Sequence, residues 1–442
     1  MFGAISFFVL GVKANSFHSQ SKLGPSQRAA GWVLCLALIL CASTRTFAQH
    51  YNQTNLVSDL PGVAPVTDPN LVNPWGLAAS STSPWWVADN GTGVSTLYNG
   101  NTGAKQALTV TIPTPVGGTP PSAPTGVVFN ANSGDFDGAR FIFVTEEGTI
   151  SAWTSGTSAV LKYTSPTKAI YKGATIAEVN GARFLYVANF YNGTVDVFNT
   201  SFAPTFVPVG AFTDPNIPAG FAPFNVQELN GNLFVAFAKQ DEDKEDEVAG
   251  AGLGFADIFD PNGNLILRLR SGHWMNAPWG VALAPDSGFG KLNNRLLVGQ
   301  FGSGEIATFD LDHGNFHGML NGSTGQPLAI EGLWALRFGN GAAAGPKTTL
   351  FFTAGIDDEA HGLFGAITPW SRGVDHDVIT SLLSPENDGA GSTVSAESNN
   401  QNSTRAPTLN VVTPIVLLPT DEEEQPAPKK RKAKEAREPR EP

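Results

Sequence analysis

Cysteine is almost absent from this sequence: its two cysteines, Cys35 and Cys41, both lie within the first 48 residues. Residues 49–442 therefore contain no thiol for a disulfide, a thiolate metal site or a cysteine nucleophile. Basic residues are also scarce, with 27 Lys and Arg against 39 Asp and Glu and a net charge of −12. Since phosphate binding needs a basic face, nucleic acid is not an expected partner.

Charged residues of both signs make up only 15% of the chain, and familiar catalytic motifs are missing. The sequence has no HExxH, no GxSxG, no Walker loop and no GxGxxG in a suitable context. It is instead rich in turn-forming and aromatic residues, with 48 Gly, 31 Pro, 29 Phe and 9 Trp. This composition suits short strands joined by turns and does not suit long helices.

The N-terminal segment has the pattern of a signal peptide. Residues 1–48 contain four basic residues and no acidic one, and residues 31–42, GWVLCLALILCA, form an apolar run of suitable length. Small residues in TFA, at 46–48, favour cleavage before Gln49. A membrane anchor would need roughly 20 apolar residues, and Leu40 is too large for a lipoprotein signal. We therefore predict an exported protein, periplasmic, on the cell surface or secreted, without a transmembrane segment in the mature chain.

A pattern of three apolar runs recurs six times along the chain. The first run of each unit begins at one of six positions: Trp75, Thr125, Ala174, Phe224, Trp279 and Leu333. The second begins at Trp86, Phe143, Tyr186, Phe234, Leu297 and Phe351. The third begins with a glycine, at Gly93, Gly148, Gly193, Gly254, Gly304 and Gly362. The period of about 50 residues, with several strands per unit, is typical of propeller blades.

We predict an all-β protein in which residues 49–384 form a six-bladed β-propeller. The motif Pro-Trp-Gly, at residues 74–76 and 278–280, marks the same corner of blades one and five. Its glycine allows a close backbone approach near the crowded axis. Residues 51–60, YNQTNLVSDL, are expected to supply the outer strand of the last blade and so close the ring.

The composition changes after Pro385, where residues 385–409 are almost free of apolar side chains. We predict that residues 385–442 form a disordered low-complexity tail. The apolar stretch 411–419 is too short to span a bilayer. The basic run KKRK, at 429–432, resembles a nuclear signal, but a solvated tail agrees better with export.

Several longer motifs indicate a family. The segment VANFYNGTVDVFN, at 187–199, resembles repeats of NHL-type and TolB-like six-bladed propellers. The segments at 55–78, 238–265 and 354–367 resemble a family of exported, uncharacterised bacterial proteins, which is similar to a mimivirus protein. The resemblance covers roughly residues 51–370 and implies the propeller fold and export. Many members end in a PEP-CTERM sorting signal, which this chain lacks, and the family supplies no catalytic residues.

Oxygen-bearing side chains follow several of the second strands, at the face where binding sites of closed β-folds tend to lie. Four of these residues are candidate metal ligands: Asp89, Glu146, Asn189 and Gln300. Calcium prefers six to eight oxygen ligands. Calcium-dependent six-bladed lactonases place a set of Glu, Asn and Asp around this channel, and Asp89, Glu146 and Asn189 could do the same here. Phe237 and Ala354 interrupt the ring. An alternative is that these side chains cap turns and bind water.

Other candidates for ligand binding lie on the same predicted face. They are Trp75, Trp279, Lys239, Asp357 and His361. The tryptophans could stack on a sugar or fill space between blades, and His361 with nearby carboxylates could supply a general base or stabilise a turn. Residues 241–247 carry six acids and one lysine, and could bind a cation, guard the channel or form a solvated loop. His313 and His317 lack a helical pattern, so no metal is expected there.

These patterns favour a non-enzymatic binding or interaction module for an extracytoplasmic protein or small molecule. One alternative is a calcium-dependent, lactonase-like hydrolase at the mouth of the channel. Another is a structural envelope protein held by its tail.

Overall fold

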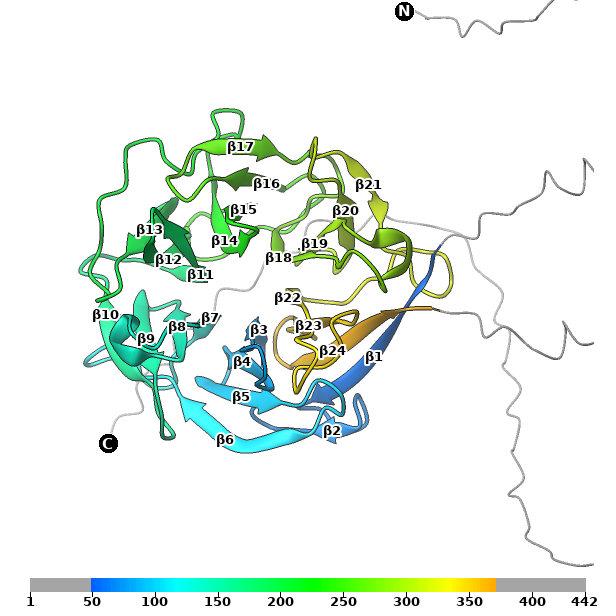
Figure 1. Ribbon diagram of the computed structural model, residues 1–442, viewed down its shortest axis with the longest axis horizontal. Helices are drawn as coiled ribbons and strands as arrows, with labels where there is room; N and C mark the ends of the chain where they lie inside the picture. Colours follow the sequence, from blue (N-terminus) through cyan, green and yellow to red (C-terminus); the bar gives the residue numbers. More distant parts are fainter. Residues whose placement is uncertain (1–48, 371–442) are drawn as a thin grey trace, which may run out of the picture. The chain divides into compact units, whose positions relative to one another are not determined.

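The structure is a computed structural model that describes residues 49–370. Within these residues the chain forms six sheets arranged around a common axis, as Figure 1 shows. The predicted six-bladed β-propeller is therefore confirmed. The predicted signal segment 1–48 and tail 385–442 lie outside the described residues.

Blades one to three follow one another along the first half of the ring. Blade one contains β3 (Pro74–Ala78), β4 (Trp85–Asp89), β5 (Val94–Tyr98) and β6 (Lys105–Thr111). Blade two contains β7 (Pro124–Phe129), β8 (Phe141–Thr145), β9 (Thr149–Trp153) and β10 (Val160–Thr164). Blade three has three strands, β11 (Tyr171–Val179), β12 (Ala182–Asn189) and β13 (Thr194–Phe198).

Blades four to six complete the ring. Blade four contains β14 (Phe221–Leu229), β15 (Asn232–Lys239), β16 (Gly254–Phe259) and β17 (Leu265–Arg268). Blade five contains β18 (Pro278–Leu283), β19 (Leu296–Gln300), β20 (Ile306–Phe309) and β21 (Phe316–Met319). Blade six contains β22 (Leu333–Phe338), β23 (Leu350–Ala354), β24 (Leu363–Pro369), β1 (Tyr51–Ser58) and β2 (Val66–Thr67). Two 3₁₀ turns, Phe136–Gly138 and Gly290–Leu292, lie between first and second strands. Among residues 49–370 no helix is long and apolar enough to span a membrane.

The ring closes as the sequence predicts. Strand β1 pairs antiparallel with β24, from Tyr51 opposite Pro369 to Ser58 opposite Leu363. The two strands lie side by side in Figure 1, dark blue beside orange. The Tyr51 hydroxyl also donates a hydrogen bond of 2.8 Å to the Phe289 carbonyl in blade five. The beginning of the propeller thus covers an edge that would otherwise be open to other chains.

The inner strands approach one another closely enough to explain the Pro-Trp-Gly motif. A Cβ atom at Gly76 would lie 2.6 Å from the Thr125 carbonyl oxygen, and one at Gly280 would lie 2.3 Å from the Trp334 carbonyl oxygen. Both neighbours are backbone atoms of the adjacent inner strand, so a side chain would push the blades apart. Each of the six inner strands also has a register irregularity near its start, which bends the strand at the crowded axis.

The connection from blade three to blade four, residues 199–220, contacts blade four through Asp214. Its carboxylate pairs with Arg268 in β17, with 2.9 Å between Arg268 Nη2 and Asp214 Oδ1. Asp257 in β16 lies beside Asp214 and is 3% exposed. Burial, together with the negative charge of Asp214, raises the pKa of Asp257 to about 7. The folded protein therefore holds Asp257 protonated under mildly acidic conditions.

Replacing Asp257 with asparagine is expected to remove a pH dependence of stability. Asp257 has a pKa of about 3.8 in the unfolded chain. Below that pH it is protonated in both the folded and the unfolded state, so it does not lower the free energy of unfolding. As the pH rises toward about 7 the unfolded state releases its proton first, so the free energy of unfolding falls. Asparagine keeps a donor toward Asp214 without titrating. In urea unfolding, Asp257→Asn should raise the free energy of unfolding at pH 5 and should raise it by on the order of 2 kcal/mol more at pH 8; an equal change at both pH values would contradict this.

Candidate binding site in the central channel

One end of the central channel is closed by four aromatic side chains, which we call the aromatic plug: Trp75, Phe224, Trp279 and Trp334. Each comes from the beginning of an inner strand, β3, β14, β18 or β22. The Trp75 and Trp334 rings stack with centroids 3.5 Å apart, and Trp279 meets Trp75 edge-on at 6.2 Å. All four are at most 4% exposed. The four rings thus pack against one another on the axis of the ring and not between neighbouring blades.

A buried lysine lies over the plug. Lys172, in β11, is fully buried and its Nζ is 5.0 Å from the centre of the Trp75 ring. It pairs with Glu146 Oε1 at 2.6 Å and with Asp246 Oδ1 at 3.0 Å. Burial by itself lowers the pKa of Lys172, but the charges of Glu146 and Asp246 outweigh burial and raise it. The lysine is therefore held in its charged form.

Hydrogen bonds connect this ion pair to the plug. Glu146 Oε2 accepts from Asn90 Nδ2 at 3.1 Å. Asn73 Nδ2 in turn contacts Asn90 Oδ1 at 3.4 Å, and Asn73 Oδ1 accepts from Trp334 Nε1 at 3.1 Å. The network therefore joins blades one, two, three and six across the closed end of the channel.

The acidic segment 241–247 lies at this closed end, on the predicted face. Asp246 reaches Lys172, and Glu245 pairs with Lys168. Glu247 is only 5% exposed. The segment is therefore not a wholly solvated loop: Glu247 is buried, and Asp246 and Glu245 pair with lysines of blade three, whereas most of its side chains remain exposed.

The four predicted metal ligands are not linked to one another by any hydrogen bond in the described part of the chain. Asp89 Oδ2 accepts from the Thr96 amide at 3.0 Å and hydroxyl at 2.8 Å. Burial raises the pKa of Asp89 well above its usual range, which opposes a charged ligand there. Asn189 Nδ2 donates to Asp196 Oδ2 in the same blade. Gln300 Oε1 accepts from the Asn276 amide, and Gln300 Nε2 donates to the Val298 carbonyl, within or beside its own blade.

Glu146, the fourth of these residues, is the partner of Lys172. Across residues 49–370 no group of three or more His, Cys, Asp or Glu is arranged to hold a metal ion. Calcium binding by the four residues stays a prediction, and the contacts above favour the alternative that they fix turns.

The other candidate ligand-binding residues are spread around the ring. Lys239 Nζ lies 5.4 Å from the centre of the Phe221 ring, at the end of β15. His361 Nδ1 is 2.6 Å from Asp59 Oδ2, which follows β1, and Asp357 Oδ2 is 4.0 Å from His361 Nε2. The Asp59–His361 pair joins the two ends of the closed ring. Asp357 is an exposed turn residue with a φ of 56°, in agreement with the turn interpretation.

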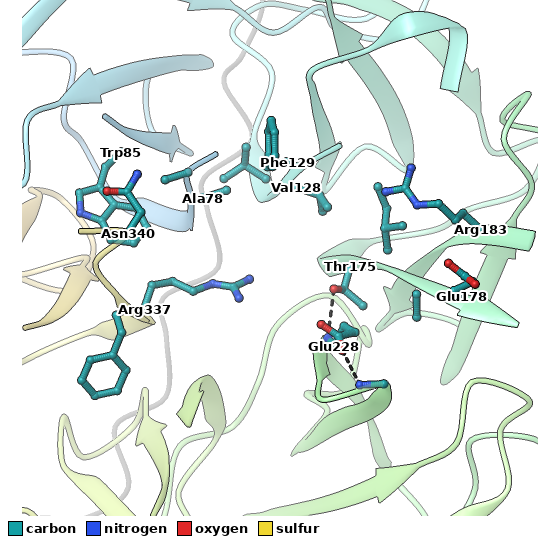
Figure 2. A pocket seen from close by; sticks show the side chains of 16 residues that line it. Ala78, Trp85, Val128, Phe129, Thr175, Glu178, Arg183, Glu228, Arg337 and Asn340 are labelled. Carbon is teal, nitrogen blue, oxygen red and sulfur yellow. Dashed lines mark hydrogen bonds between the residues drawn. The ribbon is translucent and has the colours of Figure 1, made fainter. Parts of the chain in front are cut away.

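The opposite end of the channel contains a cavity of about 510 Å³. Its walls come from the last residues of inner strands β3, β7, β11, β14 and β22, as Figure 2 shows. Beyond it the channel narrows to a space of about 10 Å³ that ends at Trp279 of the plug. That space has room for about one water molecule, so the cavity is a closed-ended pocket whose volume falls in the range of small-molecule sites.

Arg337 is the polar side chain that the sequence did not single out. It belongs to β22, lines both the cavity and the narrow space, and points its guanidinium into the cavity in Figure 2. Arg337 is half-buried and its guanidinium stays accessible to solvent; burial lowers its pKa to about 10, opposed by the charge of Glu228. Among residues 49–370 no side chain or carbonyl forms a hydrogen bond or ion pair with this guanidinium. It remains charged at neutral pH and unpaired.

Three other polar residues of the cavity have partners. Arg183 pairs with Asp135, and Asn340 Nδ2 donates to the Ser80 and Ser83 carbonyls. Glu228 Oε1 accepts from the Gly231 amide. A signal for Arg337 does exist in the sequence. The residue three places after Trp75 and Trp279 is Ala78 or Ala282, whereas three places after Trp334 it is arginine.

The fold and the site define a six-bladed β-propeller with a closed-ended central pocket. No protein-family model matches the chain. Three uncharacterized proteins of Acanthamoeba polyphaga mimivirus are similar to it. One is 28% identical over 334 residues, 71% of this chain and 78% of the relative. Another is 29% identical over 338 residues, which are 71% of this chain and 84% of the relative. The third is 33% identical over 232 residues, 51% of this chain and 42% of the relative. The expected similarity to mimivirus proteins is thus confirmed.

Solved propeller structures are more distant. A streptogramin B lyase is 13% identical with a TM-score of 0.41, covering 73% of this chain and 98% of the lyase. A protein of unknown function from Bacteroides thetaiotaomicron is 12% identical with a TM-score of 0.48, and the match covers 72% of this chain and 76% of that protein. A glucose dehydrogenase is 12% identical with a TM-score of 0.45, and the match covers 73% of this chain and 100% of the dehydrogenase. These similarities indicate nothing about the activity of this chain.

Proposed function

We propose that this chain is an exported, non-enzymatic binding protein of the uncharacterised bacterial family that its motifs resemble. Its ligand is a small molecule held in the central cavity. The observation that supports this function most is the unpaired Arg337 guanidinium in a cavity of about 510 Å³. A half-buried guanidinium without a partner among residues 49–370 can form charge-assisted hydrogen bonds with a ligand that enters the cavity. Export is supported by the basic and apolar pattern of residues 1–48.

A ligand screen with a blocked cavity tests this function. Ala79 lines the cavity, and replacing it with tryptophan should fill part of the space. At least one compound class should raise the melting temperature of the purified protein, because a ligand of the native state stabilises it by mass action. We expect Ala79→Trp to abolish that rise, and mass spectrometry to recover the compound unchanged. Val116→Trp, at a position 95% exposed, is the matched control.

The same screen separates the alternatives. A rise in melting temperature that Ala79→Trp leaves intact, or chemical conversion of the compound, would contradict the proposed function. Repeating the scans with EDTA and with calcium tests the hydrolase alternative. A calcium-dependent rise that Asn189→Ala removes would favour a metal site at the closed end of the channel. The structural envelope role predicts no ligand at all.

A further inference from the structure

The charge of Arg337 limits which ligands the cavity accepts. A guanidinium presents donors in a rigid planar fork that matches the two oxygens of a carboxylate or a phosphate. In this cavity the fork meets no acceptor from residues 49–370. An anionic group at the narrow end of the cavity would therefore gain an ion pair with little competition from the protein.

The remainder of the cavity is suited to an apolar body. Ala78, Val128, Phe129, Ile176 and Phe338 line its walls. They come from four different inner strands, so the apolar surface surrounds the space on several sides. Burying a ligand's apolar surface contributes about 25 cal/mol per Å² removed from water.

Two acidic residues further restrict the ligand. Glu178 and Glu228 line the same cavity as Arg337; Figure 2 shows Glu228 on the side of Arg337 and Glu178 farther away, near Arg183. Their charges repel a second negative charge, which a phosphate dianion or a dicarboxylate would bring. The cavity therefore favours a ligand with one anionic group over a ligand with two.

We infer that the cavity binds a small amphipathic monocarboxylate, with its carboxylate on the Arg337 guanidinium and its apolar body against the inner-strand walls. This inference rests on the proposed function and names the ligand class of that site. The carboxylate lies at the closed end, and the apolar body fills the wider part of the cavity.

The inference is tested by calorimetric titration of the full chain with matched probes. Acetate, hexanoate and phenylacetate are each compared with the corresponding neutral amide and with inorganic phosphate. Phenylacetate and hexanoate should bind at least ten-fold more tightly than their amides and than phosphate, and acetate should bind more weakly than both. Arg337→Met should weaken binding of these two carboxylates at least thirty-fold, while Arg337→Lys, which keeps the charge but loses the fork, should weaken it less.

The melting temperature without ligand gives a second readout that a merely structural arginine would not. Arg337→Met removes a half-buried charge that has no partner among residues 49–370 and keeps an apolar stem, so the ligand-free variant should melt no lower than the parent. Replacement of an arginine with a merely structural role would lower the melting temperature. Arg270→Met, at an exposed arginine outside the cavity, should change neither melting temperature nor binding. If the methionine variant fails to fold, Arg337→Lys and Arg337→Gln provide the same comparison.

Carboxylates that bind no more tightly than their amides, or whose binding survives in Arg337→Met, would overturn the inference. If neutral probes still bind and Ala79→Trp blocks them, the proposed function stands and only the ligand class is wrong. If no probe binds and no library compound shifts the melting temperature, both proposals fail.

Discussion

Replacing Lys172 with methionine is expected to lower the free energy of unfolding by about 3 kcal/mol at pH 7. The substitution removes the fully buried ammonium that pairs with Glu146 and Asp246 over the Trp75 ring. The two carboxylates then lie close together without a cation, against an aromatic surface that solvates them poorly. Urea unfolding followed by circular dichroism measures the loss.

Lys168 provides a matched control in the same blade. It pairs with Glu245 of the acidic segment, but both side chains are about half exposed. An exposed ion pair contributes about 0–1 kcal/mol and is screened by salt. Lys168→Met should therefore leave the free energy of unfolding close to that of the parent. Similar losses in both variants would contradict the claim that the buried lysine holds the segment in place.

A second substitution tests the cause of the loss. Glu146→Gln in the Lys172→Met background removes one of the stranded charges and should restore part of the stability. The amide can still accept from Asn90 Nδ2, as the carboxylate does. If the double variant is less stable than Lys172→Met, the ion pair is not the reason for the effect.

The architecture could be predicted from sequence because its signals are local. Each blade repeats apolar runs that form the first three strands, and each third run begins with a glycine. The closing strand could be predicted because residues 51–60 have the character of a strand and precede the first complete unit. Turn residues and strand patterns of this kind depend on neighbours in the chain and not on distant contacts.

The site could not be predicted in the same way, since it depends on what six distant strands place together. Asp89 and Asn189 are at equivalent positions of their blades, yet each turns to a partner in its own blade. The tryptophans meet on the axis because the inner strands pack backbone against backbone. The role of Arg337 cannot be predicted from the sequence, because one arginine in an apolar strand ordinarily indicates a solvated end.

Replacing Gly280 with alanine is expected to destabilise the ring by about 3 kcal/mol. A Cβ atom there would lie 2.3 Å from the Trp334 carbonyl oxygen and 3.1 Å from the Leu336 amide nitrogen, so β18 and β22 would have to separate. That movement would also disturb Trp279 and Trp334 of the plug. Loss of near-ultraviolet circular dichroism from the stacked indoles should accompany the loss of stability.

Gly322→Ala is the control, because a Cβ atom at that position meets its nearest neighbour at 3.6 Å, an ordinary contact. It should leave stability within about 0.5 kcal/mol of the parent. If Gly280→Ala were equally mild, the inner strands would not be held at the separation that requires glycine after Pro-Trp. A large and selective loss would explain why this motif recurs in blades one and five: the tryptophan fills the axis only when the next residue lets the neighbouring strand approach.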